Sequence, residues 1–207
     1  MAIEENKTKA ILKSIDLWGF KSFGKPTHID FSNGINVVTA PNGCGKSNLL
    51  TVITWTLFDF PEQSPNEIIF YGNENISASE FAEVLLSYET EEKGNPNISI
   101  KRKITREGNQ SFFLNDVEIE NIDIFLERIH KLKLPGICLL DDFDKDSIEK
   151  NITDIVSDFD NRRSGKQTIV VLNNKQVISA INPNRLIGLT MEEPCVSKVY
   201  SIQFEKN

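Results

Sequence analysis

The chain has 207 residues, of which 39% are hydrophobic and 26% charged, and thirteen are Phe. This composition is typical of a globular protein and excludes an intrinsically disordered one, and the length suffices for one substantial core. The net charge of −7 excludes a protein whose whole surface binds nucleic acid, so any DNA contact would be local.

The first 133 residues contain mostly strand signals and one strong helix signal. Alternating apolar residues predict strands at 10–18 and 27–31, joined by the loop GFKSFGKP, and INVVT at 35–39 predicts a buried strand. The run SNLLTVITWTLF that follows is apolar on almost every face, which predicts a helix in the middle of the domain. The runs FAEVLLSYE, NISIKRKIT and QSFFLN predict an antiparallel β lobe, closed by an amphipathic helix at NIDIFLERIHKL.

From residue 134 onward the pattern changes to alternating strands and helices. GICLL at 136–140 is a short continuous apolar run, as expected of a central parallel strand covered on both faces. Apolar residues at helical spacing predict a helix at 146–160, with Asp144 or Asp146 as its N-cap. TIVVL, VISAI and RLIGLT continue as strand, helix and strand, which indicates a parallel sheet.

The stretch from Ala40 to Ser47 has the spacing of a phosphate-binding loop, Ala-x-x-x-x-Gly-Lys-Ser, with Ala in place of the usual first Gly. Its two glycines let the backbone wrap so that N–H groups point at phosphate oxygens. Lys46 would reach the β- and γ-phosphates, and Ser47 would ligate Mg²⁺. An ordinary glycine-rich turn is the alternative, but a strand before the loop and a helix after it favour ATP and Mg²⁺. The expected cofactor-binding residues here are Pro41, Asn42, Gly43, Cys44, Gly45, Lys46, Ser47 and Asn48.

An acidic cluster, ICLLDDFD, follows the apolar run at 136–140. Asp141, directly after four apolar residues, is placed to hold the magnesium through water, and Asp142 is the candidate catalytic carboxylate that would orient an attacking water. The alternative is an acidic helix cap, which stays open for Asp144 and Asp146 and competes with the metal role of Asp141.

Three stretches, LKSIDLWGFKSFG, GINVVTAPNGCGKSNLL and LIGLTMEEPCVSKVYSI, resemble the head domain of SMC proteins, the ABC-type ATPases that organise chromosomes. They occur in the family's order with ICLLDDFD between them, and NEIIFYGNEN…FAEVLLSYE is similar to the head's first lobe. The resemblance implies an α/β fold of the P-loop NTPase class, ABC/SMC head-like, with a mixed or parallel core sheet and an antiparallel β lobe. It also implies that Lys21 and Ser22 of the GFKSF loop lie near the nucleotide. Residues 1–207 are then one nucleotide-binding domain, with halves at 1–133 and 134–207.

The chain also departs from the SMC pattern. The family's long coiled coil and hinge are absent, because ERIHKLKLPGICLLDD joins the two halves directly and no heptad run occurs. The signature motif Leu-Ser-Gly-Gly, the Gly-Gln pair of the glutamine loop and the arginine after the phosphate-loop helix are missing. Asp141-Asp142 stands where the family has Asp-Glu, and Asn173 where it has a switch histidine. A water-positioning group commonly contributes about 10²–10⁴-fold to rate, so binding and hydrolysis are predicted separately.

We expect an ATP-binding, armless SMC-like head with weak or no hydrolysis, an accessory or regulatory relative of chromosome-organising complexes. Its expected partners are a full-length SMC-type head or the accessory subunits of such a head, because without the signature motif two identical copies would not clamp ATP between them. The alternatives are a slow stand-alone ATPase that uses Asp142, and a nucleotide-free scaffold that retains the fold. A laboratory fusion of the two halves would be expected to keep the signature.

The remaining features predict location and exclude other sites. No apolar run approaches the roughly 18–20 residues of a membrane helix and the N-terminus is too polar for a signal peptide, so we expect a cytoplasmic protein without a membrane partner, associated with the chromosome if the family role is kept. The three cysteines lack metal-ligand spacing, and Cys138 is expected to be a small core residue. His28 and His130 are isolated and are interpreted as surface or packing residues rather than metal ligands. KRKITR at 101–106 is interpreted as a solvated strand face or loop, with contact to phosphate as the alternative.

Overall fold

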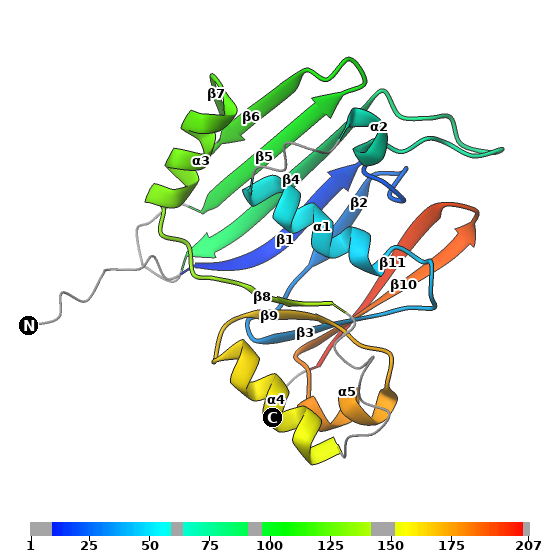
Figure 1. The fold of residues 1–207 in the computed structure, drawn as a ribbon, viewed down its shortest axis with the longest axis vertical. Coiled ribbons are helices and arrows are strands. Elements are labelled where there is room, and N and C mark those ends of the chain that lie inside the picture. The colour runs from blue at the N-terminus through cyan, green and yellow to red at the C-terminus, as the bar shows by residue number, and fades with distance from the viewer. Residues whose placement is uncertain (1–9, 59–63, 91–96, 142–151, 205–207) are drawn as a thin grey trace, which may run out of the picture.

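The computed structural model describes residues 10–58, 64–90, 97–141 and 152–204 (Figure 1). Its larger sheet is antiparallel throughout and forms the upper lobe in the view of Figure 1. The three strand runs predicted for an antiparallel lobe lie in this sheet, together with the first two strands of the chain. In spatial order the sheet contains β2 (Thr27–Asp30), β1 (Ala10–Trp18), β4 (Phe81–Thr90), β5 (Ile98–Thr105), β6 (Gln110–Leu114) and β7 (Val117–Ile119).

The smaller sheet has four parallel strands and one antiparallel edge strand. This combination of a mixed sheet and an antiparallel lobe confirms the predicted α/β class. In spatial order it contains β11 (Val196–Gln203), β10 (Arg185–Glu193), β3 (Ile35–Thr39), β9 (Thr168–Val171) and β8 (Cys138–Leu140).

Alternate residues of the smaller sheet belong to two apolar clusters. In β9, Ile169 and Val171 belong to the large core shared with α1 (Lys46–Leu57), as in the period-two pattern of a strand. Val170 lies in the second cluster, together with residues of α4 (Ile152–Arg163) and α5 (Lys175–Ile181). The two helices therefore cover the face opposite α1, as Figure 1 shows.

Helix α1 is the buried centre of the fold and confirms the helix predicted after the phosphate-binding loop. Leu49, Val52, Ile53 and Trp55 are at most 1% exposed, because the helix contacts β4 and β5 of the larger sheet and β9 of the smaller one. Burial of one such side chain stabilises the fold by roughly 1.5–3 kcal/mol. Helix α1 thus packs against both sheets.

The shorter helices differ in how well the sequence predicted them. Helix α3 (Ile122–Lys131) confirms the predicted amphipathic helix, and the Asn121 side chain caps it by accepting a hydrogen bond from the Ile124 N–H at 3.0 Å. Helix α2 (Pro65–Ile68) was not predicted. Of the helix predicted at 146–160, the part before Ile152 lies outside the described residues. No helix among the described residues is both long and apolar enough to cross a membrane.

The prediction that 136–140 forms a central strand was wrong. Strand β8 has only three residues and lies at the edge of the smaller sheet beside β9, and its residues are half-buried. A short apolar run fits an inner or an edge position equally well, and only the strand order distinguishes them. Cys138 is accordingly half-buried and not a core residue, and partial burial raises the pKa of its thiol.

Arg102 corrects the interpretation of residues 101–106 as a solvated strand face. Its side chain is buried with 2% exposure, and its guanidinium donates hydrogen bonds to the carbonyl oxygens of Trp55 and Phe58 at the end of α1. The same group donates to Gln110 Oε1 at 2.8 and 3.1 Å and lies 4.5 Å from the centre of the Trp55 ring. Arg102 therefore caps the C-terminal end of the central helix.

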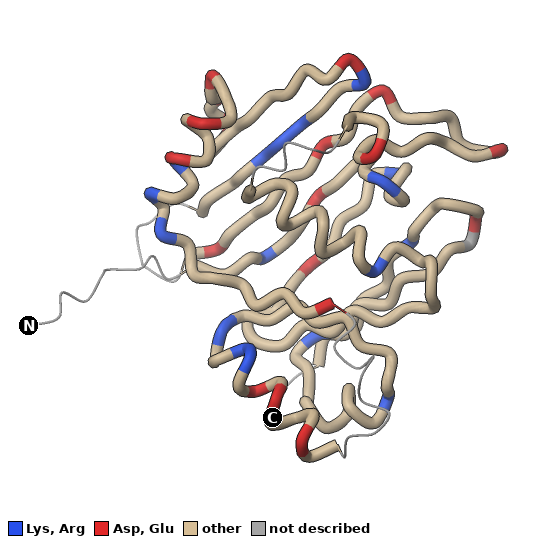
Figure 2. The backbone as a smooth tube through the Cα atoms, in the orientation of Figure 1, with Lys and Arg blue, Asp and Glu red and all other residues tan. Residues whose placement is uncertain are grey.

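The two lysines beside Arg102 lie on the other face of the larger sheet, because strand residues alternate between faces. Figure 2 shows the three residues as one basic segment of β5. Lys101 Nζ lies 4.3 Å from the centre of the Phe113 ring and Lys103 Nζ lies 3.9 Å from that of Phe81, which is cation–π geometry.

We predict that Arg102→Met lowers the free energy of unfolding by about 2–4 kcal/mol, because it leaves buried carbonyl oxygens of α1 without a donor. The matched control is Lys103→Met, one residue away on the opposite face, which should cost less than about 1 kcal/mol. Urea unfolding of both variants measures the difference. Equal losses would contradict a capping role for Arg102.

Candidate functional site

The predicted phosphate-binding loop lies between β3, which ends at Thr39, and α1, which begins at Lys46. Gly45 is the N-cap residue of α1 and has a left-handed φ of 92°, so no side chain caps the helix. The first N–H groups of a helix have no intrahelical partner, and together with the helix dipole they form an anion-binding end. The loop thus presents unpaired donors where a phosphate would sit.

The two loop glycines are required for different reasons. At Gly43, with φ 83°, an added Cβ would meet nothing within 4 Å, so only the backbone conformation favours glycine. At Gly45 a Cβ would lie 2.4 Å from Ser197 Oγ and 2.7 Å from Ser22 Oγ, closer than atoms pack. Two hydroxyl groups from distant parts of the chain would therefore have to move to admit a side chain at position 45.

The ammonium group of Lys46 is buried inside the loop. Lys46 is 7% exposed, and its Nζ donates to the carbonyl oxygens of Ala40 at 2.8 Å and Pro41 at 3.1 Å, and to Asn42 Oδ1 at 3.4 Å. All three acceptors are neutral, and no described residue forms a salt bridge with this lysine. A buried cation is costly without a counter-ion, and a ligand phosphate would supply one.

The GFKSF loop brings Ser22 to the phosphate-binding loop. Phe20 and Phe23 are fully buried, which anchors the segment between them against the core. The Ser22 hydroxyl accepts a hydrogen bond of 2.9 Å from Asn48 Nδ2, in the first turn of α1. Lys21 has a left-handed φ of 48°, and among the described residues its side chain forms no hydrogen bond with the loop.

The carboxyl ends of β3, β9 and β8 meet at one edge of the smaller sheet, where Asp141 is exposed. Leu140 at the end of β8 pairs with Val170, and Val38 near the end of β3 pairs with Val171, the next residue of β9. Strands β8 and β3 therefore end at nearly the same height, and Asp141 lies level with the start of the phosphate-binding loop. One strand separates β8 from β3, which puts about 10 Å between them. Asp142 lies outside the described residues. The roles of Asp141 and exposed Ser47 in holding magnesium, and of Asp142 in positioning water, stay predictions.

Asn173 contacts the entrance of the loop. It follows β9, and its Oδ1 accepts hydrogen bonds from the Ala40 N–H at 3.4 Å and the Thr39 hydroxyl at 3.5 Å. The SMC pattern has its switch histidine at this position. In this chain the asparagine side-chain amide instead links the end of β9 to the start of the phosphate-binding loop.

Ser197 is a site residue that the sequence analysis missed. It lies in β11, is 5% exposed, and its hydroxyl donates a hydrogen bond of 2.9 Å to the Cys44 carbonyl oxygen. Its Oγ lies 2.8 Å from Ser22 Oγ, and its N–H donates to the Ser22 carbonyl oxygen at 2.7 Å. The only available signal was its place in TMEEPCVSKV, which carried the family resemblance without assigning any residue a chemical role.

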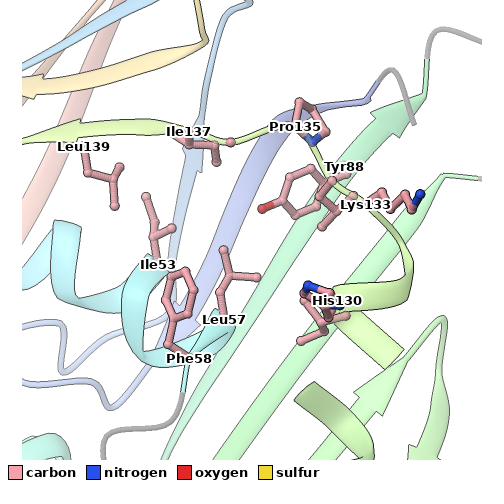
Figure 3. Close-up of a pocket in the computed structure, with 12 residues that line it drawn as sticks. Ile53, Leu57, Phe58, Tyr88, His130, Lys133, Pro135, Ile137 and Leu139 are labelled. Atoms are coloured by element: carbon pink, nitrogen blue, oxygen red, sulfur yellow. The ribbon is translucent and has the colours of Figure 1, made fainter. Parts of the chain in front are cut away.

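A separate apolar cavity of about 510 Å³ lies where the end of α1 and α3 meet residues 133–137 (Figure 3). Aliphatic side chains such as Ile53 and Leu57 line it, with the ring of Tyr88, whose burial raises the pKa of its hydroxyl. None of its lining residues belongs to 40–48, so this cavity is not part of the phosphate-binding loop.

The isolated histidines have no metal-site partners within the part of the chain that the structure describes, where no cluster of three or more His, Cys, Asp or Glu could hold a metal ion. His28 instead lies between two carboxylates on the outer face of the larger sheet. Its Nδ1 is 2.6 Å from Asp16 Oδ1, and this hydrogen bond raises the pKa of His28; Asp30 Oδ1 lies 3.2 Å from its Nε2.

The family described as the RecF/RecN/SMC N terminal domain matches residues 11–132, more than half of the chain. The chain belongs to this family. The match contains the GFKSF loop and the whole phosphate-binding loop, which confirms the SMC resemblance that these motifs carried.

Sequence relatives in this family are chromosome partition proteins. The chromosome partition protein Smc of Lactiplantibacillus plantarum is 33% identical over 122 residues, covering 55% of this chain and 10% of the relative. Smc of Bacillus subtilis is 32% identical over 128 residues, covering 56% of this chain and 11% of the relative. The chain thus spans about a tenth of the length of these relatives.

Solved structures extend the likeness to the C-terminal half. An SMC head bound to the C-winged helix domain of ScpA superposes with a TM-score of 0.76 over 94% of this chain and 98% of that chain, at 17% identity. A structure from work on ATP-driven dimerisation of SMC ATPases gives a TM-score of 0.53 at 26% identity, covering 59% of this chain and 80% of that chain. The fold is that of an SMC head.

We predict that Gly45→Ala destabilises the nucleotide-free protein by about 2–3 kcal/mol, because the new methyl group collides with two hydroxyls in addition to the backbone strain. Gly43→Ala is the matched control, with the same sign of φ and open space, and should cost about 1 kcal/mol. Urea unfolding without nucleotide measures both. A loss at position 45 no larger than at position 43 would contradict the close packing of Gly45.

Proposed function

We propose that this chain is a single SMC-head-like nucleotide-binding domain, over residues 1–207, that binds ATP with Mg²⁺ through residues 40–48. The observation that carries this proposal is the buried ammonium of Lys46, which has only neutral acceptors and lies at the uncapped end of α1. A triphosphate would replace those acceptors with anionic oxygens and accept from the free N–H groups of the helix end. Sequence relatives and fold support the same ligand class.

Several residues have proposed parts in holding the ligand and its metal. Ser47 and Asp141 would hold Mg²⁺, and the bound metal would neutralise charge on the phosphates. Ser22, which is hydrogen-bonded to Asn48, would lie near the nucleotide, and so would Lys21 of the same GFKSF loop. The remaining loop residues contribute backbone N–H groups and shape: Pro41, Asn42, Gly43, Cys44 and Gly45.

Weak or no hydrolysis is the second part of the proposal. Asp142 is one methylene shorter than the glutamate of the SMC pattern, so its carboxylate would not reach an attacking water in the same way. Asn173 has a side-chain amide that does not take up a proton, and it is engaged with the loop entrance at 3.4 Å. Both differences affect turnover more than binding.

The direct connection between the halves supports an accessory or regulatory role in a chromosome-organising complex. Association with the chromosome is part of the same proposal and rests on the sequence relatives. Helix α3 ends at Lys131 and β8 begins at Cys138, so residues 132–137 join the two sheets without an inserted arm. A head joined in this way would bind nucleotide without transmitting motion to a coiled coil.

We predict that calorimetry with ATP and Mg²⁺ gives binding heat with the wild type, and that Lys46→Ala weakens binding at least about tenfold, equivalent to about 1.4 kcal/mol. Lys101→Ala, a lysine on the outer face of the lobe, is the control and should bind like the wild type. ATP with Mg²⁺ at about 100 times Kd should also stabilise the wild type by about 2.7 kcal/mol.

The outcomes separate the candidate functions. Absence of binding heat from the wild type would contradict the ATP-binding proposal and favour a nucleotide-free scaffold. Binding without phosphate release over hours supports the incomplete head. Phosphate release that Lys46→Ala abolishes would favour a slow ATPase that uses Asp142.

An accessory subunit is the proposed partner, docking on the edge strand β11. Tyr200, Ile202 and Phe204 are 48%, 59% and 43% exposed and alternate along this strand and just beyond its end, which places an apolar row on the surface. A structural neighbour binds the C-winged helix domain of ScpA, which makes a winged-helix domain the class of partner to test.

We predict that Ile202→Ser weakens binding of a purified ScpA C-winged helix domain at least about tenfold, because the few residues that carry most of the binding energy cluster near the centre of an interface. Ser201→Ala, the next residue along the same strand with its side chain on the other face, is the control and should bind like the unmodified chain. A surface-based binding assay measures the affinity of each variant for the ScpA domain. Equal affinities for Ile202→Ser and Ser201→Ala would exclude this apolar row as the docking site.

A further inference from the structure

Ser197 controls the orientation of one peptide unit in the phosphate-binding loop. Its hydroxyl donates to the Cys44 carbonyl oxygen at 2.9 Å, and the described chain contains no cis peptide bond. In a trans peptide the C=O and the following N–H point in opposite directions, so the Gly45 N–H points away from β11. That direction is away from the Ser22 and Ser197 hydroxyls.

One arrangement of protons satisfies all the hydroxyl contacts around Ser197 at once. The Cys44 carbonyl only accepts, so the single hydroxyl proton of Ser197 is used there. Ser197 Oγ must then accept from the Ser22 hydroxyl at 2.8 Å, and Ser22 Oγ accepts in turn from Asn48 Nδ2 at 2.9 Å. The result is a directed chain of three hydrogen bonds, from Asn48 through Ser22 and Ser197 to Cys44.

This hydrogen-bond chain begins and ends within the same short segment. Asn48 is in the first turn of α1 and Cys44 is in the loop, and between them lie the residues whose N–H groups face the proposed phosphate. The two serines come from the GFKSF loop and from β11, 175 positions apart in sequence. They hold the ends of residues 44–48 at a fixed separation and from one side.

We propose that Ser197 is a positioning residue for the phosphate site, which acts through the Cys44 carbonyl and Ser22 to preorganise the Gly45 N–H for a phosphate oxygen. The inference rests on the proposed ATP binding and makes the C-terminal hairpin part of that site. The hairpin is also tied to the end of the GFKSF loop by an ion pair of 2.9 Å between Lys25 and Glu193. Ser197 itself would not touch the nucleotide.

The expected effect of Ser197→Ala is a rise of about tenfold in the Kd for ATP with Mg²⁺. The peptide between Cys44 and Gly45 is then no longer held in place, because the Cys44 carbonyl oxygen has lost its hydrogen-bond donor. Ser197→Thr keeps the hydroxyl on a strand residue and should restore the Kd to within about threefold of the wild type. Val196→Ala, a buried neighbour on the same strand, should lower the melting temperature without changing the Kd.

A double-mutant cycle tests the directed chain. Ser22→Ala and Ser197→Ala break the same chain, so the double variant should bind little more weakly than either single variant. Calorimetry with ATP and Mg²⁺ measures all the affinities, and thermal unfolding without nucleotide measures the loss of stability.

The outcomes distinguish this inference from the proposed function. Wild-type binding with an unchanged Kd in Ser197→Ala would overturn the inference alone. A Kd that rises equally in Val196→Ala would also overturn it, because general loosening of the hairpin would then explain the effect. Absence of wild-type heat overturns both the inference and the ATP-binding proposal.

Discussion

The burial of helix α1 between the two sheets is the interaction on which the rest of the structure depends. Its side chains fill the main apolar core, and it contacts strands of both the antiparallel lobe and the mixed sheet. Trp55 packs against Phe20 with ring centroids 5.3 Å apart, and Phe20 in turn anchors the GFKSF loop. The position of this helix therefore sets the position of the phosphate-binding loop that precedes it and of the loop beside it.

The two ends of α1 are satisfied in opposite ways. At the C-terminal end a buried arginine from β5 donates to the carbonyl oxygens of Trp55 and Phe58, so the protein itself supplies donors at that end. At the N-terminal end Gly45 supplies no side chain, and the nearby hydroxyls of Ser22 and Ser197 bond to Asn48 and to a carbonyl oxygen. A helix with one end closed by the protein and the other left open is suited to hold an anion.

The same contrast clarifies what is retained relative to other SMC heads. The residues that shape the loop are packed against distant parts of the chain, so their loss would disturb the fold as well as the site. The signature motif and the switch histidine of the SMC pattern, which this sequence lacks, are expected to act on a bound nucleotide. In the proposed function, nucleotide binding and hydrolysis would therefore depend on different residues.

The sequence by itself determined the phosphate-binding loop, the buried helix after it, the antiparallel lobe and the family. These are local patterns, since the glycine spacing and the hydrophobic period are set by backbone geometry within one segment. The tertiary structure alone decided that β8 lies at an edge, that Arg102 is buried as a helix cap, and that Ser197 reaches the loop. Each of these depends on which segments become neighbours in space. The hydrophobic period of a segment does not reveal the order of the strands in a sheet. Ser197 and Ser22 meet because β11 and the GFKSF loop converge on Gly45, a contact between segments that lie at opposite ends of the chain.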